Sequence, residues 1–437
     1  MNSLYHTSQK KQYSCQKTET VVYCGQLILR RCFVMKKPLT LRWIYLVVGV
    51  LTMLFSGVLY AWSILKVPFK GELGYSDSSL ALAFTLTMCF FCLGAFFGSL
   101  ICKKIGVFFT LLLSGVLVGA GFGLSGMLTA GSLWLLYTAY AVLAGLGIGI
   151  VYNVVVSTVN AWFPDRKGLC SGCLMMGFGL STLLLGNLIG SLFDSAFGWQ
   201  KTYWLLGGLI GGVIVLAGVI LRKPSADCVL PAPKPKKNKP AVQPKDYTTL
   251  EMLKSGTFWC AFLCFIFMTA VGNSVISFAR DLVISVDAAP ALATTLVGVL
   301  AVCNGLGRVV TGMAYDWLGR RATMISANLL TIVAAGITLL AVQLHSLPLC
   351  IVGLCLTGMS YGSCPTVTSA FSAGFYGQKH FAVNYSITNF NLIFASFIAT
   401  GANSLLIGTG GYTAPFIMLL AIAVAALGLN VTIREKR

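Results

Sequence analysis

The chain has 437 residues, of which 57% are hydrophobic and only 10% are charged. Its mean hydropathy of +0.84 is far above that of a soluble protein, which excludes a soluble domain with a large core. The formal net charge of +19 could indicate a nucleic-acid-binding protein, but the basic residues lie in short segments between long apolar runs. Nucleic acid is therefore not an expected partner.

A helix that spans a membrane needs about 20 consecutive apolar residues, and the sequence contains twelve such runs. They lie near residues 41–65, 78–101, 107–128, 133–158, 168–193, 202–221, 257–284, 289–315, 322–343, 347–372, 380–405 and 412–433. Strands of a membrane barrel would be shorter and would alternate polar with apolar residues. The pattern predicts an all-α integral membrane protein with twelve transmembrane helices in two pseudo-symmetric six-helix bundles.

The segment before the first run, residues 1–34, is polar and basic and lacks the apolar core and cleavage site of a signal peptide. We expect this extension to be disordered, or to be upstream sequence, because MKKPLTLRWIYLVVG from Met35 has the form of a natural start.

Lysine and arginine cluster in alternate loops, as in Lys103–Lys104, Arg166–Lys167 and Arg320–Arg321. Positive residues in short loops stay on the cytoplasmic side of a membrane. Both termini are therefore predicted to be cytoplasmic, in agreement with an even number of spans. We expect a monomer that passes repeatedly through the lipid bilayer of the cell membrane.

One long loop separates six runs before Leu221 from six runs after Gly256. We expect an N-terminal bundle at 35–221, a basic, proline-rich cytoplasmic linker at 222–256 and a C-terminal bundle at 257–437. A short amphipathic helix is expected in TTLEMLKSG, near the end of the linker. Two repeated halves are the architecture of secondary transporters, which bind their substrate near the midplane between the halves.

Arg308 is the one ionisable side chain of consequence in the central part of any run. An arginine at the centre of a membrane helix costs about 2.5–3.5 kcal/mol on insertion scales, so it usually faces a polar cavity. It precedes Asp316 by eight residues, or about 12 Å of helix, which is far for a side chain to reach the helix end. A guanidinium binds a carboxylate through two parallel hydrogen bonds. We therefore expect a small carboxylate as the substrate of Arg308.

The runs contain no embedded Asp or Glu that could neutralise Arg308 or relay a proton. A proton-coupled carrier normally needs such a relay, so anion exchange is favoured over proton-coupled monocarboxylate symport. Symport stays an alternative, because the proton could travel on the substrate acid. A membrane sensor that binds a metabolite without transporting it is a remoter alternative. No nucleophile–base set or metal cluster occurs in the runs, so we expect neither an enzyme nor a cofactor or metal.

Other polar and aromatic residues recur on helical faces and could line a cavity together with Arg308. Asn304 lies one turn before Arg308, and three residues of the eleventh run follow i, i+4, i+7 spacing. The candidate substrate-binding residues are Arg308, Asn304, Asn391, Asn384, Thr388, Tyr60, Trp62, Tyr152 and Tyr361.

The segment GMAYDWLGRR, which joins the eighth and ninth runs, is a candidate conformational latch. Gly312 permits close approach of the chain. Asp316 is expected either to pair with Arg320 or Arg321 or to cap a neighbouring helix. Such contacts can hold one conformation and release in the other.

This segment resembles the signature of the major facilitator superfamily, although the matching GSLICKKIG of the first half has Cys102 in place of the aspartate. More narrowly, the chain after Met35 resembles the oxalate/formate antiporter family. The matching pieces are GVLYAWSILKVPF, GLGIGIVYN, WFPDRKGLCSG, YTTLEMLKSGTFW and NGLGRVVTGMAYDWLGRR. The resemblance implies twelve helices, exchange of small carboxylates by a rocker-switch movement, and carboxylate binding by Arg308.

One departure from that family concerns the substrate. Oxalate exchange in the family uses a second cation, a lysine on the eleventh span, where this chain has Asn391 or Leu392. One arginine neutralises one carboxylate, so formate, lactate or pyruvate is favoured over oxalate. The similar monocarboxylate carriers have an acid four residues before the arginine, where this chain has Asn304, which again disfavours proton-coupled symport.

Overall fold

The computed structural model describes residues 38–225, 228, 230–231, 246–409 and 411–433. The chain divides into two compact units, Met1–Ile44 and Tyr45–Arg437, and the account below concerns the second, larger one. The expectations for residues 1–34 and for the middle of the linker, 232–245, lie outside the described residues.

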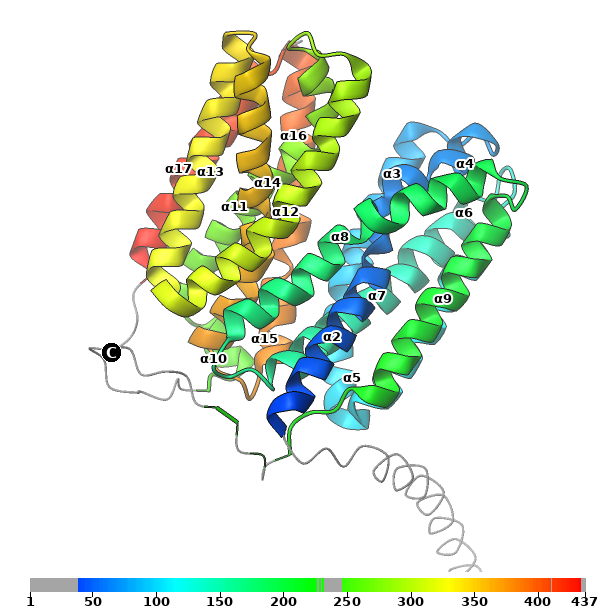
Figure 1. Cartoon of the computed structure of the whole chain (residues 1–437), viewed down its shortest axis with the longest axis vertical. Helices are drawn as coiled ribbons and strands as arrows, with labels where there is room; N and C mark the ends of the chain where they lie inside the picture. Colours follow the sequence, from blue (N-terminus) through cyan, green and yellow to red (C-terminus); the bar gives the residue numbers. More distant parts are fainter. Residues whose placement is uncertain (1–37, 226–227, 229, 232–245, 410, 434–437) are drawn as a thin grey trace, which may run out of the picture. The chain divides into compact units, whose positions relative to one another are not determined.

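The described chain is helical, in two successive sets of helices (Figure 1). The first set is α2 (Pro38–Ser56), η1 (Gly57–Ala61), α3 (Trp62–Leu65), α4 (Val67–Gly71), α5 (Asp77–Ser125), α6 (Leu133–Leu136), η2 (Tyr137–Ala144), α7 (Gly145–Asn160), α8 (Lys167–Asp194) and α9 (Trp199–Ile220). The second set is α10 (Thr249–Leu253), α11 (Gly256–Ile284), α12 (Pro290–Leu318), α13 (Arg320–Gln343), α14 (Leu347–Phe375), α15 (Phe381–Thr388), α16 (Asn391–Thr409) and α17 (Thr413–Thr432).

Eleven helical segments in the described part of the chain are long and apolar enough to cross a membrane. One of them, Leu82–Ser125, has 44 residues, or about 66 Å of helix, which is twice the thickness of a bilayer core. It contains a turn at Gly106, whose φ of 82° and ψ of 176° are not helical. The segment therefore consists of two spans, and the predicted twelve-helix membrane fold is confirmed.

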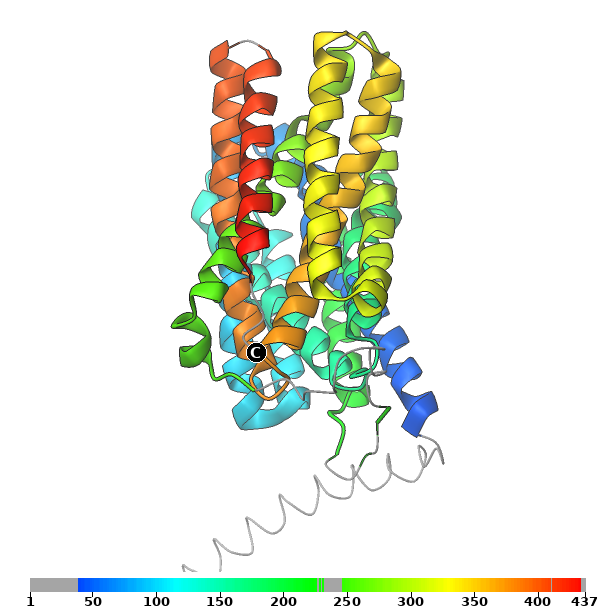
Figure 2. The same ribbon diagram turned by 90° about the vertical axis from the view of Figure 1, so that its left-hand side faces the viewer.

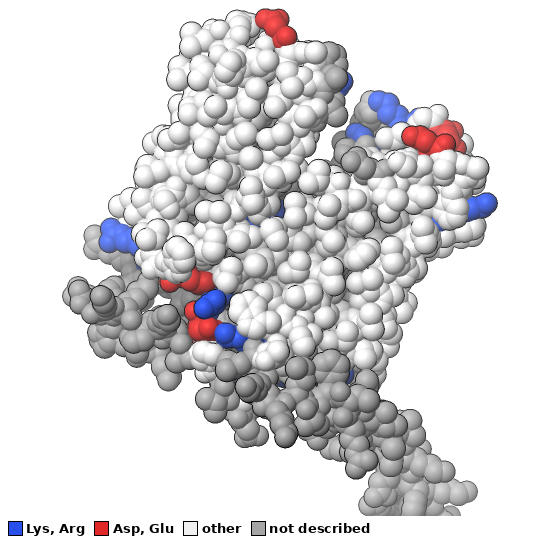
Figure 3. All heavy atoms as spheres, viewed as in Figure 1, with Lys and Arg blue, Asp and Glu red and all other residues white. Residues whose placement is uncertain are grey.

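The turn at Gly106 recurs in the second half at Gly319, between α12 and α13, with φ 84° and ψ 175°. The same backbone conformation at corresponding connections agrees with the expected pseudo-symmetry of the two bundles. On the face shown in Figure 3, charged side chains lie toward the two ends of the helices, and the surface between them is almost entirely uncharged. Such a band is suited to contact with lipid.

Three membrane spans have an irregular point next to one cavity. η1 interrupts the first span around Tyr60, α14 contains Pro365, and the eleventh span is divided between α15 and α16 at Asn389. Irregular backbone at membrane depth is tolerated where it lines a cavity or is buried in protein. All three points border the cavity described below.

The described end of the linker is attached to the second half. The predicted short helix is confirmed as α10, which begins with a capping box between Thr248 and Glu251. The backbone N–H of Tyr247 donates to the carbonyl of Tyr376 at 3.0 Å, and the Asp246 carboxylate accepts from the N–H of Lys379 at 3.1 Å. This segment therefore lies against the start of α15 (Figure 2).

Candidate functional site

The central cavity is lined by helices of both halves. The lining residues are Tyr60, Phe91, Tyr152, Thr269, Arg308, Tyr361, Pro365, Thr368, Asn389, Asn391 and Leu392. Among these described residues Arg308 is the only charged one, so the cavity carries a single positive charge.

Arg308 lies on α12 and is 5% exposed. Its Nε donates to Oδ1 of Asn304 at 3.2 Å, and its Nη1 donates to the backbone carbonyl of Met175 on α8. These two acceptors are neutral. No ion pair joins Arg308 to a carboxylate within the part of the chain that the structure describes. A buried charge without a counter-charge is costly, so the cavity is electrostatically prepared for an anion.

Glycines of α8 allow that helix to lie against Arg308. A Cβ on Gly172 would lie 2.5 Å from the backbone oxygen of Arg308, and a Cβ on Gly179 would lie 2.8 Å from its Cζ. The first half thus contacts both the backbone and the guanidinium of the candidate anchor.

Aromatic residues form the wall of the cavity on the side of the first half. The rings of Tyr60 and Tyr152 each pack edge to face with the ring of Phe178. The centroid distances to Phe178 are 5.3 Å for Tyr60 and 5.2 Å for Tyr152. Tyr361 of α14 lies on the opposite wall, where its ring occupies the space that a side chain on Gly272 would need. Six predicted residues therefore meet at one site, since Arg308, Tyr60, Tyr152, Tyr361 and Asn391 line the cavity and Asn304 holds Arg308.

Three other candidate residues do not line the cavity. Trp62 packs inside the first half, with its ring 4.6 Å from that of Tyr140. The Asn384 side chain bonds the linker end, accepting from Thr249 and donating to the carbonyl of Tyr247. Thr388 donates to the carbonyl of Asn384 and accepts from Ser372.

Six lining residues were not among the candidates from the sequence: Phe91, Thr269, Pro365, Thr368, Asn389 and Leu392. Three carried a signal. Leu392 is one of the two positions that match the second cation of the similar family. Asn389 lies in the polar stretch NYSITNFN, and Pro365 is a proline within a long apolar run. The others are ordinary residues of membrane helices.

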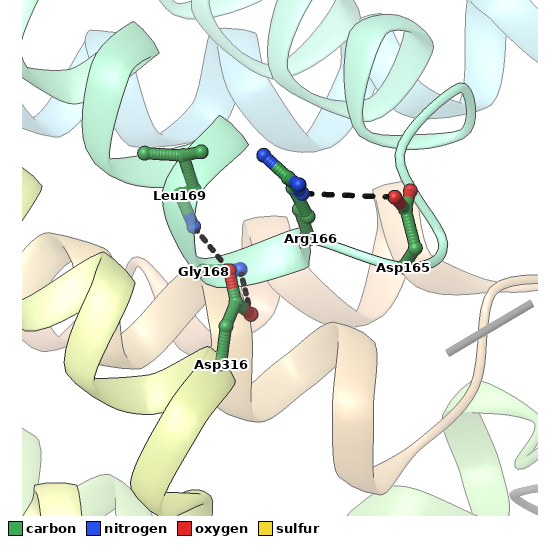
Figure 4. A network of polar contacts seen from close by, with 5 residues as sticks. All are labelled: Asp165, Arg166, Gly168, Leu169 and Asp316. Carbon is green, nitrogen blue, oxygen red and sulfur yellow. Dashed lines mark hydrogen bonds and ion pairs between the residues drawn. The ribbon is translucent and has the colours of Figure 1, made fainter. Parts of the chain in front are cut away.

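The Asp316 end of the helices joins the two halves. Both oxygens of the Asp316 carboxylate accept backbone hydrogen bonds at 2.8 Å, one from Gly168 and one from Leu169 (Figure 4). These N–H groups belong to the first turn of α8, whose positive dipole end favours a carboxylate. Of the two alternatives left open by the sequence, Asp316 therefore caps a neighbouring helix.

The other candidate latch residues surround this cap. Gly312 packs against the backbone of Gly168, where a Cβ would collide with the carbonyl oxygen. Arg320 is 9% exposed and its Cζ lies 5.4 Å from the centre of the Phe375 ring. Arg321 is exposed. Burial raises the pKa of the neighbouring Tyr376 phenol, so this phenol stays neutral.

Further hydrogen bonds join the halves between the cavity and Asp316. The hydroxyls of Tyr152 and Tyr385 lie 2.9 Å apart, and Nδ2 of Asn153 donates to the carbonyl of Ala382 at 3.0 Å. Nearer Asp316, the hydroxyls of Ser171 and Ser369 lie 3.0 Å apart. The cavity is thus separated from the Asp316 end by a series of contacts across the two halves.

Comparison with known proteins gives the family context. A sequence model described as Major Facilitator Superfamily matches residues 44–279, more than half of the chain. A second model, described as Sugar (and other) transporter, matches residues 254–436.

Two characterised relatives are similar over part of their length. The Oxalate:formate antiporter of Oxalobacter formigenes is 32% identical over 65% of this chain and 65% of that protein. Monocarboxylate transporter 12-B of Danio rerio is 31% identical over 42% of this chain and 38% of that protein. The matches therefore span less than two thirds of either relative.

Among solved structures, the major facilitator transporter FucP in the outward conformation has a TM-score of 0.68 with 11% sequence identity, covering 91% of this chain and 100% of that chain. At this identity the similarity concerns the fold alone.

Proposed function

The chain belongs to the major facilitator superfamily, and on this premise we propose that it exchanges small monocarboxylates across the cell membrane by alternating access. Its fold and relatives are those of multi-pass membrane transporters rather than enzymes. The substrate class and the exchange mechanism are the proposed part.

The observation that carries the proposal is the state of Arg308. Its guanidinium is buried at the edge of a cavity between the halves, and among the described residues only neutral groups accept its hydrogen bonds. A substrate carboxylate would supply the missing negative charge and would accept two parallel hydrogen bonds. Asn304 orients the guanidinium from one turn away, while Tyr60, Tyr152, Tyr361 and Asn391 shape the cavity.

The charge of the cavity supports a monocarboxylate over a dicarboxylate. Asn391 and Leu392, at the position where the similar antiporters have their second cation, both line the cavity and both are neutral. Oxalate would therefore keep one carboxylate without a cation in a partly apolar site, which is costly. The printed names of the relatives, an oxalate:formate antiporter and a monocarboxylate transporter, agree with a small carboxylate.

Two features support exchange rather than proton symport. The cavity-lining residues that the structure describes include no Asp, Glu or His. The buried charge of Arg308 also disfavours closure of the empty cavity, so movement is coupled to loading. A ligand drives such a change through its different affinity for the two states.

The topology completes the proposal. We assign the Asp316 end to the cytoplasm, because the short loops at this end carry Lys103–Lys104, Arg166–Lys167 and Arg320–Arg321. The bundle boundaries 35–221 and 257–437 stay a prediction, with α9 ending at Ile220 and α11 beginning at Gly256.

The test is uptake of labelled formate, lactate, pyruvate and oxalate into proteoliposomes, with and without unlabelled anion inside. We expect uptake that requires internal anion and does not respond to an imposed pH gradient. Arg308→Ala should abolish uptake and Arg308→Lys should lower it strongly. Arg280→Ala, which removes an exposed arginine near the end of α11, is the matched control.

Two results would contradict the proposal. Full transport by well-folded Arg308→Ala protein would remove Arg308 from the site. Uptake into empty vesicles driven by an inward proton gradient would replace exchange by symport, while keeping Arg308 as the anion site.

A further inference from the structure

Asn389 has an unused hydrogen-bond donor at the cavity. It lies at the connection between α15 and α16, lines the cavity and is 3% exposed. Its side-chain Nδ2 is buried and lies near the Tyr385 hydroxyl, but it makes no hydrogen bond of good geometry with the described residues. Buried polar groups in proteins almost always have partners, and each exception calls for an explanation.

The backbone of Asn389 is held from several sides. Its N–H donates to the carbonyl of Tyr385 at 2.9 Å, and its carbonyl accepts from the N–H of Leu392 at 3.1 Å and from Sγ of Cys92 at 3.6 Å. The donor from Cys92 comes from the other half of the molecule. These contacts fix the backbone that carries the Asn389 side chain, at the point where the eleventh span is interrupted.

We propose that Asn389 is a specificity-determining residue, which donates a hydrogen bond to a second, uncharged oxygen of the substrate while Arg308 binds its carboxylate. This inference rests on the proposed function. A bound substrate oxygen would satisfy the donor, whereas a substrate without that oxygen would leave it buried and unpaired, at the expense of affinity.

The side chains that line the cavity restrict the class of substrate further. An amide is neutral, so it suits a keto or hydroxyl oxygen rather than a second carboxylate. Phe91, Pro365 and Leu392 provide apolar surface for a small hydrocarbon group. The fitting class is a short 2-oxo or 2-hydroxy monocarboxylate. Formate has neither the second oxygen nor the hydrocarbon group, and propionate has only the latter.

The experiment compares pyruvate, lactate and propionate, which share a three-carbon skeleton and a carboxylate. In exchange assays the wild-type protein should transport pyruvate or lactate at least about tenfold more efficiently than propionate, because sites built to bond an oxygen reject analogues that lack it. Asn389→Leu, which keeps the side-chain size, should lose this preference through slower pyruvate and lactate transport. Propionate transport should not fall.

Two further variants sharpen the test. Asn389→Asp places a carboxylate beside the anion site and should lower transport of all three acids. Asn273→Leu is the matched control, because Asn273 is an α11 asparagine that donates to Ser396 and does not line the cavity. It should keep the wild-type preference.

Different experimental results would contradict the inference and the proposed function. Equal transport of pyruvate and propionate by the wild-type protein, or an unchanged preference in Asn389→Leu, would overturn the role of Asn389 and leave carboxylate exchange intact. Absence of transport for every carboxylate would overturn the proposed function itself. The wild-type comparison decides the inference even where a variant does not fold.

Discussion

Gly179 of α8 leaves room for the guanidinium of Arg308, although the two residues belong to opposite halves of the molecule. A Cβ at position 179 would lie 2.8 Å from Cζ and 2.9 Å from Nη1 of Arg308. Real Cβ atoms essentially never come so close to another heavy atom. The position of the arginine therefore depends on the absence of a side chain across the interface.

Gly179→Ala is expected to displace Arg308 and to weaken transport. Displacement of a binding group by about 1 Å can cost about a hundredfold in rate, so we expect KM for the carboxylate to rise at least about tenfold. Gly190→Ala is the control on the same helix, because its Cβ would meet no atom within 4 Å. Equal kinetics for the two variants would show that the close approach has no role in binding.

Asp316→Asn is expected to loosen the first turn of α8. The substitution removes the negative charge and one of two acceptor oxygens, which should cost about 1 kcal/mol. Hydrogen exchange of the Gly168 and Leu169 amides should accelerate about fivefold, and more in Asp316→Ala. Asp165→Asn is the control, since Asp165 forms a 3.8 Å ion pair with Arg166. Unchanged exchange in Asp316→Ala would exclude the cap as a latch.

Tyr385→Phe removes the hydroxyl that meets Tyr152 across the halves while keeping the ring. The lost hydrogen bond should shift the equilibrium by about 1 kcal/mol toward the conformation open at the Asp316 end. Pulsed electron paramagnetic resonance between labels at the exposed positions Lys104 and Lys379 would report a larger population at long distance. Tyr412→Phe, at the opposite end, should leave the distribution as in the wild type.

Gly319→Ala is expected to destabilise the turn between α12 and α13. With φ 84° and ψ 175°, Gly319 has a backbone conformation that is essentially restricted to glycine, and an alanine there should cost about 1–3 kcal/mol. Gly336→Ala, within α13 and with no atom near its Cβ, should be close to neutral. Thermal unfolding in detergent distinguishes the two, and equal midpoints would contradict the strain argument.

The membrane fold could be predicted from the sequence because it depends on the length of the apolar runs. Hydrophobic runs of about 20 residues are readable without knowledge of neighbours, and α5 divides at Gly106, which lies between two such runs. Arg308 was identifiable for a similar reason, since its distance from the ends of its apolar run can be counted in the sequence, and an arginine near the centre of a membrane helix is costly. Its partner Asn304 follows from helical spacing.

The remaining site residues depend on which neighbour a helical face meets. Spacing alone places Asn384 and Thr388 on one face, but that face contacts the linker end and Ser372. Trp62 is close in sequence to Tyr60, yet the change from η1 to α3 turns it into the first half. The unpaired amide of Asn389 is visible only once every surrounding donor and acceptor has a position.

The contact between α8 and α12 has a mechanical consequence. At one end of this helix pair lie Asp316 and the glycines at 168 and 312, and further along it lie the guanidinium and Gly179. Under the proposed function, binding of the substrate and closure of the Asp316 end would therefore depend on the same two helices. A substrate that drew Arg308 away from the carbonyl of Met175 on α8 would then act on the same helix pair that carries the Asp316 cap.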